Sequence, residues 1–446
     1  MIPINEYRTK LKGLLEKQDA CKSAINNNPK IKWIKRGTWT ASLAWAAFLI
    51  VQSVPYYQAI AAGDADYKVG NYDSAELHFQ NAVKQTTSYG ATDLRKAKAW
   101  NNLAEIYRAK YQLTDAELLY KKSELLTQSL PANRPEIPMA MHNLASVYRD
   151  EGRLDESEQL ERQALTRFDK YNKAPDMKRA SILNGLGKTL RDKGKYAESE
   201  RTYTEALKIQ MHFLGSNDSE NAGVYANLGG IRRDLGDFLG ATRYYKQALT
   251  LDREALGATH PYVGTDLNNL GCLYRDAKKY AEAKTSFDDA LAIRRLSFGP
   301  NSPLVAKTQL GLAELAIRQH KYREAQALLL QVQRTHSLTL PANHPDRAVF
   351  YNLMGEVYLA QGAAQKAYDY ENRCLQIRER VTGATHADYA VALADRACAE
   401  RVLADTISFE KDSARAKKIL KDTIGTQCPV SDRVFEALRK ANSTKS

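Results

Sequence analysis

The chain has 446 residues, 43% of them hydrophobic, and a formal net charge of +13 at pH 7. That hydrophobic fraction is enough for a packed core, so the composition excludes a wholly disordered protein. The length allows two or three globular domains or one long array of repeats.

The excess of positive charge is concentrated at the start of the chain. Residues 1–36 contain nine Lys or Arg and three Asp or Glu, whereas the rest of the chain holds 56 and 49. A nucleic-acid-binding protein usually carries its excess on one folded face. The basic arm precedes an uncharged apolar stretch instead, so we expect a membrane flank and no nucleic-acid partner.

The apolar stretch that follows the basic arm covers residues 38–57. Its centre reads WTASLAWAAFLIVQSV, with Trp and Tyr toward its two edges, where such rings suit the headgroup regions. A membrane span needs about 20 mostly apolar residues, and this stretch just meets that length. We therefore predict a transmembrane helix over 37–57, with the arm 1–36 cytoplasmic and the remainder of the chain on the far side of the membrane.

Two alternatives to the anchor stay open. The sequence AIA at 59–61 resembles a signal-peptidase site, although a basic region of 36 residues is far too long for a signal peptide. The stretch could also be a buried helix that packs on the first repeat, in which case the protein is cytoplasmic.

A period of 41 or 42 residues runs through the chain after this stretch. LPANRPEI at 130–137 returns as LPANHPDR at 340–347, five periods later. Gly or Ala recurs in the same register at Ala104, Ala145, Gly187, Gly229, Gly271, Ala313, Gly355 and Ala397. Small residues at fixed places in paired helical patterns predict that two helices touch closely in every period.

Each period is predicted to hold two helices. The first ends near a glycine suited to a left-handed cap, at Gly152, Gly194, Gly236 or Gly362. The second begins near Leu154, Tyr196, Phe238, Tyr280 or Tyr322. In the loops between periods, a Pro suits the first turn of the next helix, and the residue before it can cap that helix, as at His260, Ser302, His344 and His386.

The first helix carries a recognisable signature. In WNNLAEIY at 100–107, Trp100, Leu103, Ala104 and Tyr107 match the W-x2-L-G/A-x2-Y pattern of a tetratricopeptide repeat. With its longer period, NNL-A/G-xx-YRD and GxxHP, the sequence resembles the kinesin-light-chain type of that repeat. The resemblance implies an all-α superhelix of about eight to nine helix-turn-helix repeats, with the array over 58–405 and a degenerate final repeat and capping helix over 406–446.

Two columns of polar residues are candidates for the concave groove that the resemblance implies. The first is Asn102, Asn143, Asn227 and Asn269, and the second is Arg108, Arg149, Arg191, Arg233 and Arg275. Asn can hold an extended backbone, and Arg offers a planar fork to carboxylates. A related family of repeats clamps a C-terminal carboxylate with similar side chains. We therefore expect a protein or peptide ligand, either acidic or held by its C-terminal carboxylate.

The arginine column has a second interpretation. Asp150, Asp192, Asp234 and Asp276 follow four of the arginines directly, so the arginines could pair with acidic neighbours between repeats and bind nothing. The column ends where Ile317 and Leu359 stand in its register, which predicts a more apolar groove, or one for another partner, in the C-terminal half.

No catalytic motif is present, so we expect no enzymatic activity and no cofactor. The histidines at the repeat loops lie too far apart to converge on a metal, and the five cysteines have no metal-binding spacing. The expected function is a membrane-anchored scaffold that binds partner proteins. The alternatives are a soluble cytosolic adaptor of kinesin-light-chain type and an accessory module of an envelope or secretion machinery.

Overall fold

The computed structural model describes residues 53–68, 71–110, 112–131, 133–172, 174–340, 342–423 and 429–443. The chain divides into two compact units, 1–61 and 62–446, and all the helices named below lie in the second. Most of the predicted transmembrane helix, 37–52, lies outside the described residues. Among the residues that are described, none of the helices is both long and apolar enough to cross a bilayer.

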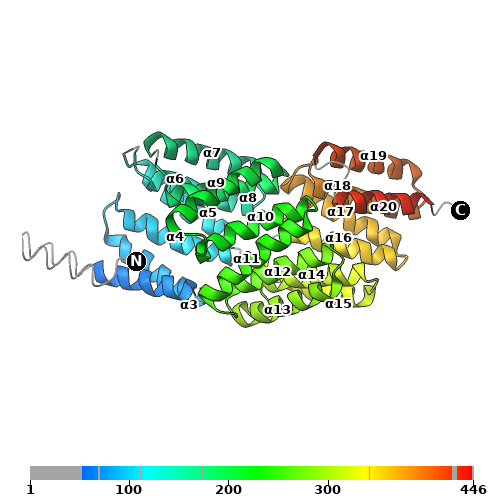
Figure 1. Cartoon of the computed structure of the whole chain (residues 1–446), viewed down its shortest axis with the longest axis horizontal. Helices are drawn as coiled ribbons and strands as arrows, with labels where there is room; N and C mark the ends of the chain where they lie inside the picture. Colours follow the sequence, from blue (N-terminus) through cyan, green and yellow to red (C-terminus); the bar gives the residue numbers. More distant parts are fainter. Residues whose placement is uncertain are drawn as a thin grey trace, which may run out of the picture. The chain divides into compact units, whose positions relative to one another are not determined.

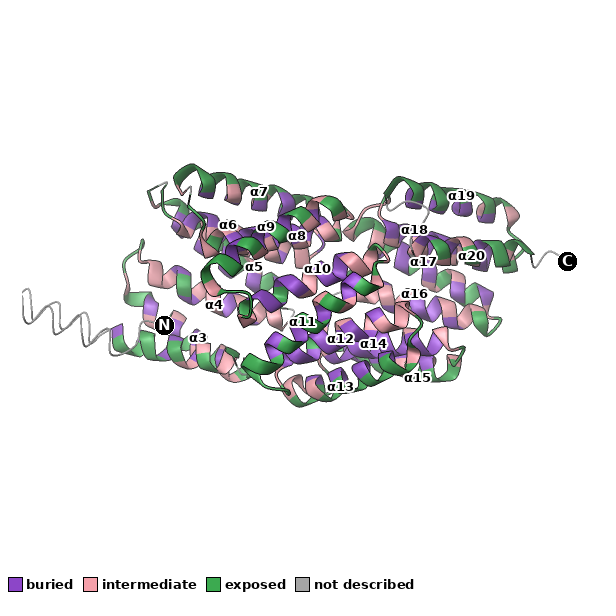
Figure 2. Ribbon diagram, viewed as in Figure 1, coloured by how far each residue is buried: buried purple, intermediate pink, exposed green. Residues whose placement is uncertain are grey.

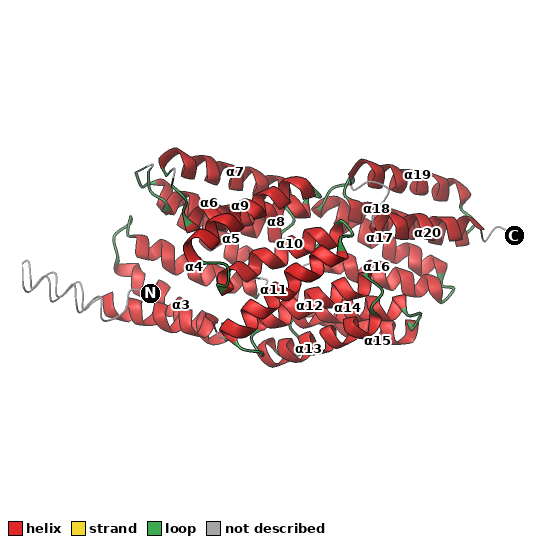
Figure 3. Ribbon diagram, viewed as in Figure 1, coloured by secondary structure: helices red, strands yellow, loops and turns green. Residues whose placement is uncertain are grey.

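The second unit consists of helices, and its described residues contain no strand (Figure 3). After a helical stretch that ends at 68 come α3 (Tyr72–Gln85), α4 (Leu94–Ala109), α5 (Leu113–Gln128), α6 (Glu136–Asp150), α7 (Leu154–Tyr171) and α8 (Met177–Asp192). Next are α9 (Tyr196–Leu214), α10 (Ala222–Asp234), α11 (Phe238–Leu256), α12 (Pro261–Asp276), α13 (Tyr280–Phe298) and α14 (Pro303–Arg318). The last are α15 (Tyr322–Thr339), α16 (Pro345–Ala360), α17 (Ala364–Val381), α18 (Ala387–Val402), α19 (Thr406–Thr423) and α20 (Pro429–Ser443). Short 3₁₀ turns lie at Thr86–Ser88 and Ser219–Asn221.

The helices pack in pairs that follow chain order (Figure 1). Each even-numbered helix from α4 to α18 packs on the helix that follows it, and neighbouring pairs pack on one another. The helix α20 closes the series by packing on α18 and α19. The predicted all-α array of helix-turn-helix repeats is therefore confirmed. The boundary expected at residue 405 falls between the two helices of the last pair.

The column of small residues lies at the contact within each pair. Its alanines, Ala104 among them, are completely buried. A Cβ added to Gly187 would come within 2.8 Å of the Tyr203 ring, and one added to Gly271 within 2.6 Å of Phe287. The first helix thus has a small residue at the point where a large aromatic ring of the second helix packs against it. This interdigitation is the close contact that the period predicts. Figure 2 shows the buried residues concentrated on the even-numbered helices α10, α12 and α14.

The turns inside the pairs also agree with the sequence. Gly152 adopts a φ of 79°, and the amide of Arg153 donates to the carbonyl of Tyr148, which is a Schellman closure. The five predicted starts of second helices are the first residues of α7, α9, α11, α13 and α15. In three pairs the left-handed position is not glycine: Lys278, His320 and Ala404 adopt φ values of 59°, 59° and 64°.

The loops between pairs end in the predicted caps. Pro261, Pro303 and Pro345 are the first residues of α12, α14 and α16. The side chains that accept a hydrogen bond from a first-turn amide are those of His260, Ser302, His344 and His386. These caps satisfy amides that have no partner inside the helix.

Candidate functional site

Contacts between repeats far apart in the chain enclose the inner face of the array. The Nε2 atom of His260, before α12, lies 2.6 Å from the carbonyl oxygen of Lys68. The ring of Tyr72, at the start of α3, stacks on that of Phe298, at the end of α13, with centroids 5.5 Å apart. The first repeat therefore lies against the end of the α12–α13 pair at which α12 begins and α13 ends.

A second set of contacts joins the early turns to the end of the array. Gly152, in the turn after α6, touches Val381 at the end of α17, and any Cβ added there would overlap that side chain. A Cβ on Gly194, in the equivalent turn after α8, would lie 3.9 Å from the ring of His386. The array thus returns on itself, and the inner faces of its repeats surround a common space.

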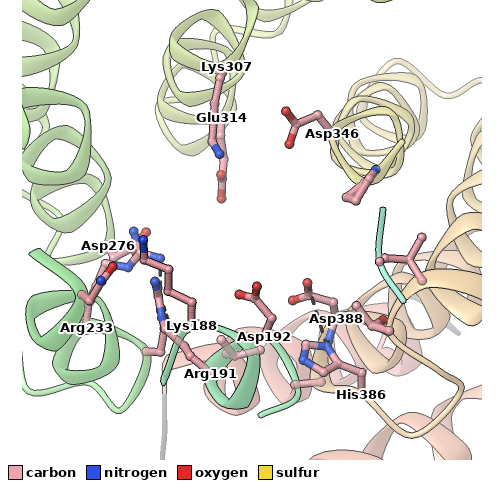
Figure 4. A pocket seen from close by; sticks show the side chains of 18 of the residues that line it. Lys188, Arg191, Asp192, Arg233, Asp276, Lys307, Glu314, Asp346, His386 and Asp388 are labelled. Carbon is pink, nitrogen blue, oxygen red and sulfur yellow. Dashed lines mark hydrogen bonds and ion pairs between the residues drawn. The ribbon is translucent and has the colours of Figure 1, made fainter. Parts of the chain in front are cut away.

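That space is a cavity of about 1320 Å³. Its walls come mainly from the even-numbered helices α4 to α18, together with α20. In Figure 4, Lys307 and Asp346 face Asp192 and Asp388 across the open centre. Eleven Lys or Arg and ten Asp or Glu line the cavity, so its walls are densely charged but close to neutral in sum. Such walls suit a polar or charged ligand rather than an apolar one.

All five arginines of the predicted column line this cavity, and each pairs with a carboxylate of the next repeat. The N–O distances are 2.9 Å for Arg108–Asp150, 3.8 Å for Arg149–Asp192, 2.8 Å for Arg191–Asp234, 3.6 Å for Arg233–Asp276 and 2.7 Å for Arg275–Glu314. The second interpretation of the column, pairing between repeats, therefore describes its geometry. Whether the arginines also contact a ligand stays a prediction.

Two of the paired aspartates, Asp150 and Asp234, have carboxyl pKa values that the arginines keep below the ordinary value. Asp234 lies 2.8 Å from Arg191 and 3.0 Å from Arg233. Burial by itself would raise the pKa of the Asp234 carboxyl, but the two guanidinium groups outweigh it and keep the pKa below its ordinary value. The pKa of Asp150 is lowered in the same way, against burial, by Arg149 and Arg108. The column is thus a ladder of alternating charges that links successive repeats.

The ladder continues into the C-terminal half, where the sequence predicted a more apolar groove. That expectation is wrong, because Ile317 turns into the helix core while Glu314 and Arg318 line the cavity. Arg318 pairs with Glu356 at 3.3 Å, and Arg433 of α20 pairs with the same carboxylate at 2.9 Å. The terminal helix thus supplies the guanidinium that the last repeats lack.

The asparagine column is placed differently from the arginine column. Of its four members, Asn227 is the one that lines the cavity, and its Nδ2 donates to Asn184 at 3.0 Å. Asn102 donates to Asp64 at 3.2 Å, and Asn143 and Asn269 are partly buried. A spacing of six residues turns the helix by about 600°, which leaves the two columns roughly 120° apart. The expectation that both columns face the same space was therefore too simple.

Sequence reasoning missed several residues that face the cavity, among them Lys188, Lys307, Asp346 and Arg433. A repeat-register signal existed for the first of them. The repeat position three residues before the arginine is Glu105 in α4 and Lys188 in α8. The equivalent position in α14 is Glu314, and all three residues line the cavity. Reading that third column would have found cavity residues. Arg433 had no such signal, because it lies outside the repeats.

The histidines of the repeat loops act as helix caps in this structure. Where residues are described, no group of three or more His, Cys, Asp or Glu is arranged to hold a metal ion. The described cysteines, Cys272, Cys374 and Cys398, are free thiols.

The fold and its enclosed inner face define a repeat solenoid, and the comparisons with known proteins identify the repeat. Two sequence profiles described as tetratricopeptide repeat match the chain, one at 136–211, 220–295 and 273–335, the other at 60–131 and 310–380. Together they cover most of the array, so the chain is a tetratricopeptide-repeat protein. No curated protein sequence matches it significantly.

Solved structures of other proteins are similar to the chain at low sequence identity. A Rap protein complexed with Competence and Sporulation Factor is 16% identical, with a TM-score of 0.61, over 84% of this chain and 99% of that one. BtubC from P. vanneervenii is 21% identical, with a TM-score of 0.39, over 54% of this chain and 91% of that one. The repeats of a kinesin light chain from Podosopora anserina are 19% identical, with a TM-score of 0.36, over 47% and 98%.

Proposed function

We propose that this tetratricopeptide-repeat protein is a scaffold that binds a segment of a partner protein, or a peptide, inside the cavity. The observation that carries the proposal is the cavity itself, about 1320 Å³ in volume and lined from nearly every repeat. Small-molecule pockets usually span roughly 300–1,000 Å³. A longer polar ligand, such as a stretch of polypeptide, makes better use of this space.

The charge pattern of the walls supports a polar ligand that is selected by electrostatic complementarity. Alternating carboxylates and guanidinium groups present donors and acceptors around the whole space. Complementary charges on the cavity wall and on the ligand mainly determine which partner binds and how it is aligned in the cavity. They also make binding sensitive to salt. The Rap protein of the same fold was solved with Competence and Sporulation Factor bound, so a fold of this kind is compatible with a bound partner.

The test of the proposal fills the cavity with a bulky side chain. Lys307 is exposed to the cavity, whereas Leu239 is 82% exposed on the outside of α11. Partners would be captured with the tagged full-length chain from the cells that make it, alongside the Lys307→Trp and Leu239→Trp variants. The proposal expects Lys307→Trp to lose partners that Leu239→Trp retains, at equal melting temperature. Equal capture by both variants would place the binding surface elsewhere.

We also propose that residues 37–57 anchor the chain in a membrane, with 1–36 cytoplasmic and the repeats on the far side. The support comes from the sequence, in which the basic residues precede an uncharged apolar stretch. Carbonate extraction should leave the full chain in the membrane fraction. A thiol introduced at Ser443 should react with an impermeant reagent on intact cells, and one at Ser23 should not. Recovery in the soluble fraction would favour the cytosolic adaptor instead.

A further inference from the structure

The helix α20 does not continue the array in the way that the earlier repeats do. Each even-numbered helix from α6 to α18 packs more on the odd-numbered helix before it than on the even-numbered helix before that. α20 reverses this order, because it packs more on α18 than on α19 (Figure 1). Its residues Val430, Asp432, Arg433 and Glu436 line the cavity. The helix therefore lies over the inner face of the last repeats, where a ligand would lie.

Arg433 ties α20 to three even-numbered helices at once. Its guanidinium group lies 2.9 Å from Glu356 of α16, 3.5 Å from Asp395 of α18 and 3.7 Å from Glu314 of α14. The ladder arginines, in contrast, pair with carboxylates of their own repeat and of the next one. One side chain of α20 thus contacts successive repeats along the groove, as a bound ligand would.

The carboxylates under α20 depend on this cation. In the part of the chain that the structure describes, Asp395 has no other Lys or Arg within ion-pair distance, and its remaining partner is the amide of Asn352 at 2.8 Å. Burial and the neighbouring Glu356 raise the pKa of the Asp395 carboxyl to about 6, although Arg433 opposes this shift. The inner face of the last repeats therefore needs a cation that those repeats do not supply.

α20 also covers an apolar strip beside these carboxylates. Val434 and Leu438, each 2% exposed, belong to the buried cluster that includes Leu393 of α18 and Leu420 of α19. Positions 434 and 438 are one turn apart and lie on the same face of α20. Apolar residues at this spacing are the usual anchors of an amphipathic helix bound in a groove. The surface under α20 thus accepts a helix that has a basic residue at the edge of its apolar face.

The array does not depend on α20 for its other contacts. The packing partners of α20 are α18 and α19, the last pair. In a repeat array each repeat contacts its neighbours, so the departure of α20 leaves the pairs from α4–α5 to α16–α17 intact. A single helix can therefore leave this surface while the repeats that form the surface stay folded.

We propose that α20 is an internal competitor, and that the surface it covers on α14, α16 and α18 binds a basic amphipathic helix of a partner protein. The inference rests on the proposed function and deepens it, because it names the class of ligand for this end of the cavity. The partner helix places a Lys or Arg against Glu356 and Asp395, and two apolar residues where Val434 and Leu438 lie. Binding requires that α20 is displaced, so α20 limits access to the surface.

The first test releases α20 in the full-length chain. Arg433→Glu sets a carboxylate against three carboxylates, so mass-spectrometric hydrogen exchange of the amides 430–443 should become faster by about tenfold or more. The amides of α18 and α19, 387–423, should change far less. The control is Arg439→Glu, the same charge reversal at an exposed position of α20, which should leave exchange unchanged. Equal loss of protection in α18, α19 and α20 would show that α20 is a structural cap and would overturn the inference.

The second test measures binding to the vacated surface. The probe is a fluorescent synthetic peptide of residues 429–443, followed by anisotropy. Full-length Arg433→Glu should bind it about tenfold or more tightly than wild type and Arg439→Glu do, because in those chains α20 occupies the surface. The same peptide with the R433E substitution should bind none of the chains. If α20 is released but the peptide binds Arg433→Glu no better than wild type, the surface is not a docking site.

These outcomes separate the inference from the function on which it rests. If Lys307→Trp retains every partner of the wild-type chain, binding inside the cavity fails whatever α20 does. If Lys307→Trp loses partners, but Arg433→Glu and wild type bind the α20 peptide equally, the inference alone is wrong. Capture of additional partners by Arg433→Glu, absent with Arg439→Glu, is the result expected when α20 limits access.

Discussion

His260 and Lys68, 192 positions apart in the chain, are joined by a contact of 2.6 Å between the imidazole Nε2 and the backbone carbonyl oxygen. The same ring accepts the amide of Tyr262 through Nδ1 at 3.2 Å, so one neutral imidazole caps α12 and holds the first repeat. The contact is one of those that turn an open array into an enclosure.

Replacing His260 separates these two roles. Asn can keep the cap but is too short to reach Lys68, whereas Ala loses both interactions. We expect His260→Asn to change the free energy of unfolding little and His260→Ala to lower it by about 1 kcal/mol. Both variants should exchange the amide hydrogens of 71–85 faster than wild type in mass-spectrometric hydrogen exchange. Unchanged exchange in His260→Ala would show that the contact does not hold the first repeat.

The ladder should behave as a structural unit. Asp234 accepts from Arg191 and Arg233, so its loss leaves two partly buried guanidinium groups without their shared carboxylate. We expect Asp234→Ala to lower the free energy of unfolding by about 2 kcal/mol, and Arg191→Met in that background to recover part of it. Urea unfolding of the single and double variants measures the coupling. Additive effects would contradict pairing.

The Asp234 carboxylate makes the free energy of unfolding depend on pH, and the direction of its pKa shift fixes the sign of that dependence. The pKa of Asp234 is lower in the folded chain than in the unfolded chain, because the arginines outweigh burial. Its contribution is therefore present above the unfolded pKa and lost as pH falls through the folded pKa. Wild type should lose more stability between pH 5 and pH 3 than Asp234→Asn does. Parallel pH profiles would be inconsistent with this account.

A pair of buried carboxyl groups should act in the opposite direction. Asp252 of α11 and Asp266 of α12 are 7% and 4% exposed, and burial together with Asp252 raises the pKa of Asp266 to about 8. The folded chain then binds more protons than the unfolded chain between about pH 4 and pH 8, so stability falls as pH rises through that window. Asp266→Asn should raise the free energy of unfolding at pH 7 by about 1–2 kcal/mol. Asp289→Asn, on an exposed part of α13, is the matched control and should have no such effect.

One turn offers a stabilising substitution. Ala404 holds a φ of 64° where Gly236 and Gly362 stand in other repeats. A left-handed conformation costs an L-residue roughly 1–2 kcal/mol, part of which is offset by the greater freedom of Gly in the unfolded chain. Ala404→Gly should therefore raise stability by about 0.5–1 kcal/mol, and Gly236→Ala should lower it. A melting curve in which both substitutions destabilise would contradict the assignment of strain.

The sequence predicted the repeats well because their signals are local. The starts of α7 and α9 coincide with Leu154 and Tyr196, since a turn glycine followed two residues later by a large apolar or aromatic residue recurs in several periods. The enclosure was not predictable in that way. Contacts such as Gly152 with Val381 depend on small rotations that accumulate over several repeats and leave no trace at either position.

The site was predicted only in part, because some of its residues have a local repeat signal and others depend on contacts between repeats. The arginines were found by their register, but their pairing across repeats was only one of two interpretations until their neighbours were placed. Lys188 was missed because its register holds mixed residue types, among them Gly230 and Cys272, and so stands out less than the arginine column.

The central claim is that partners bind inside the cavity, and site-specific photo-cross-linking tests it most directly. A benzoylphenylalanine would replace Asp192, which is exposed to the cavity, or Leu296, which is 78% exposed on α13. On illumination of the cells that make the protein, the account predicts a cross-linked partner from position 192 and none from position 296. A partner captured at position 296 and absent at position 192 would contradict it.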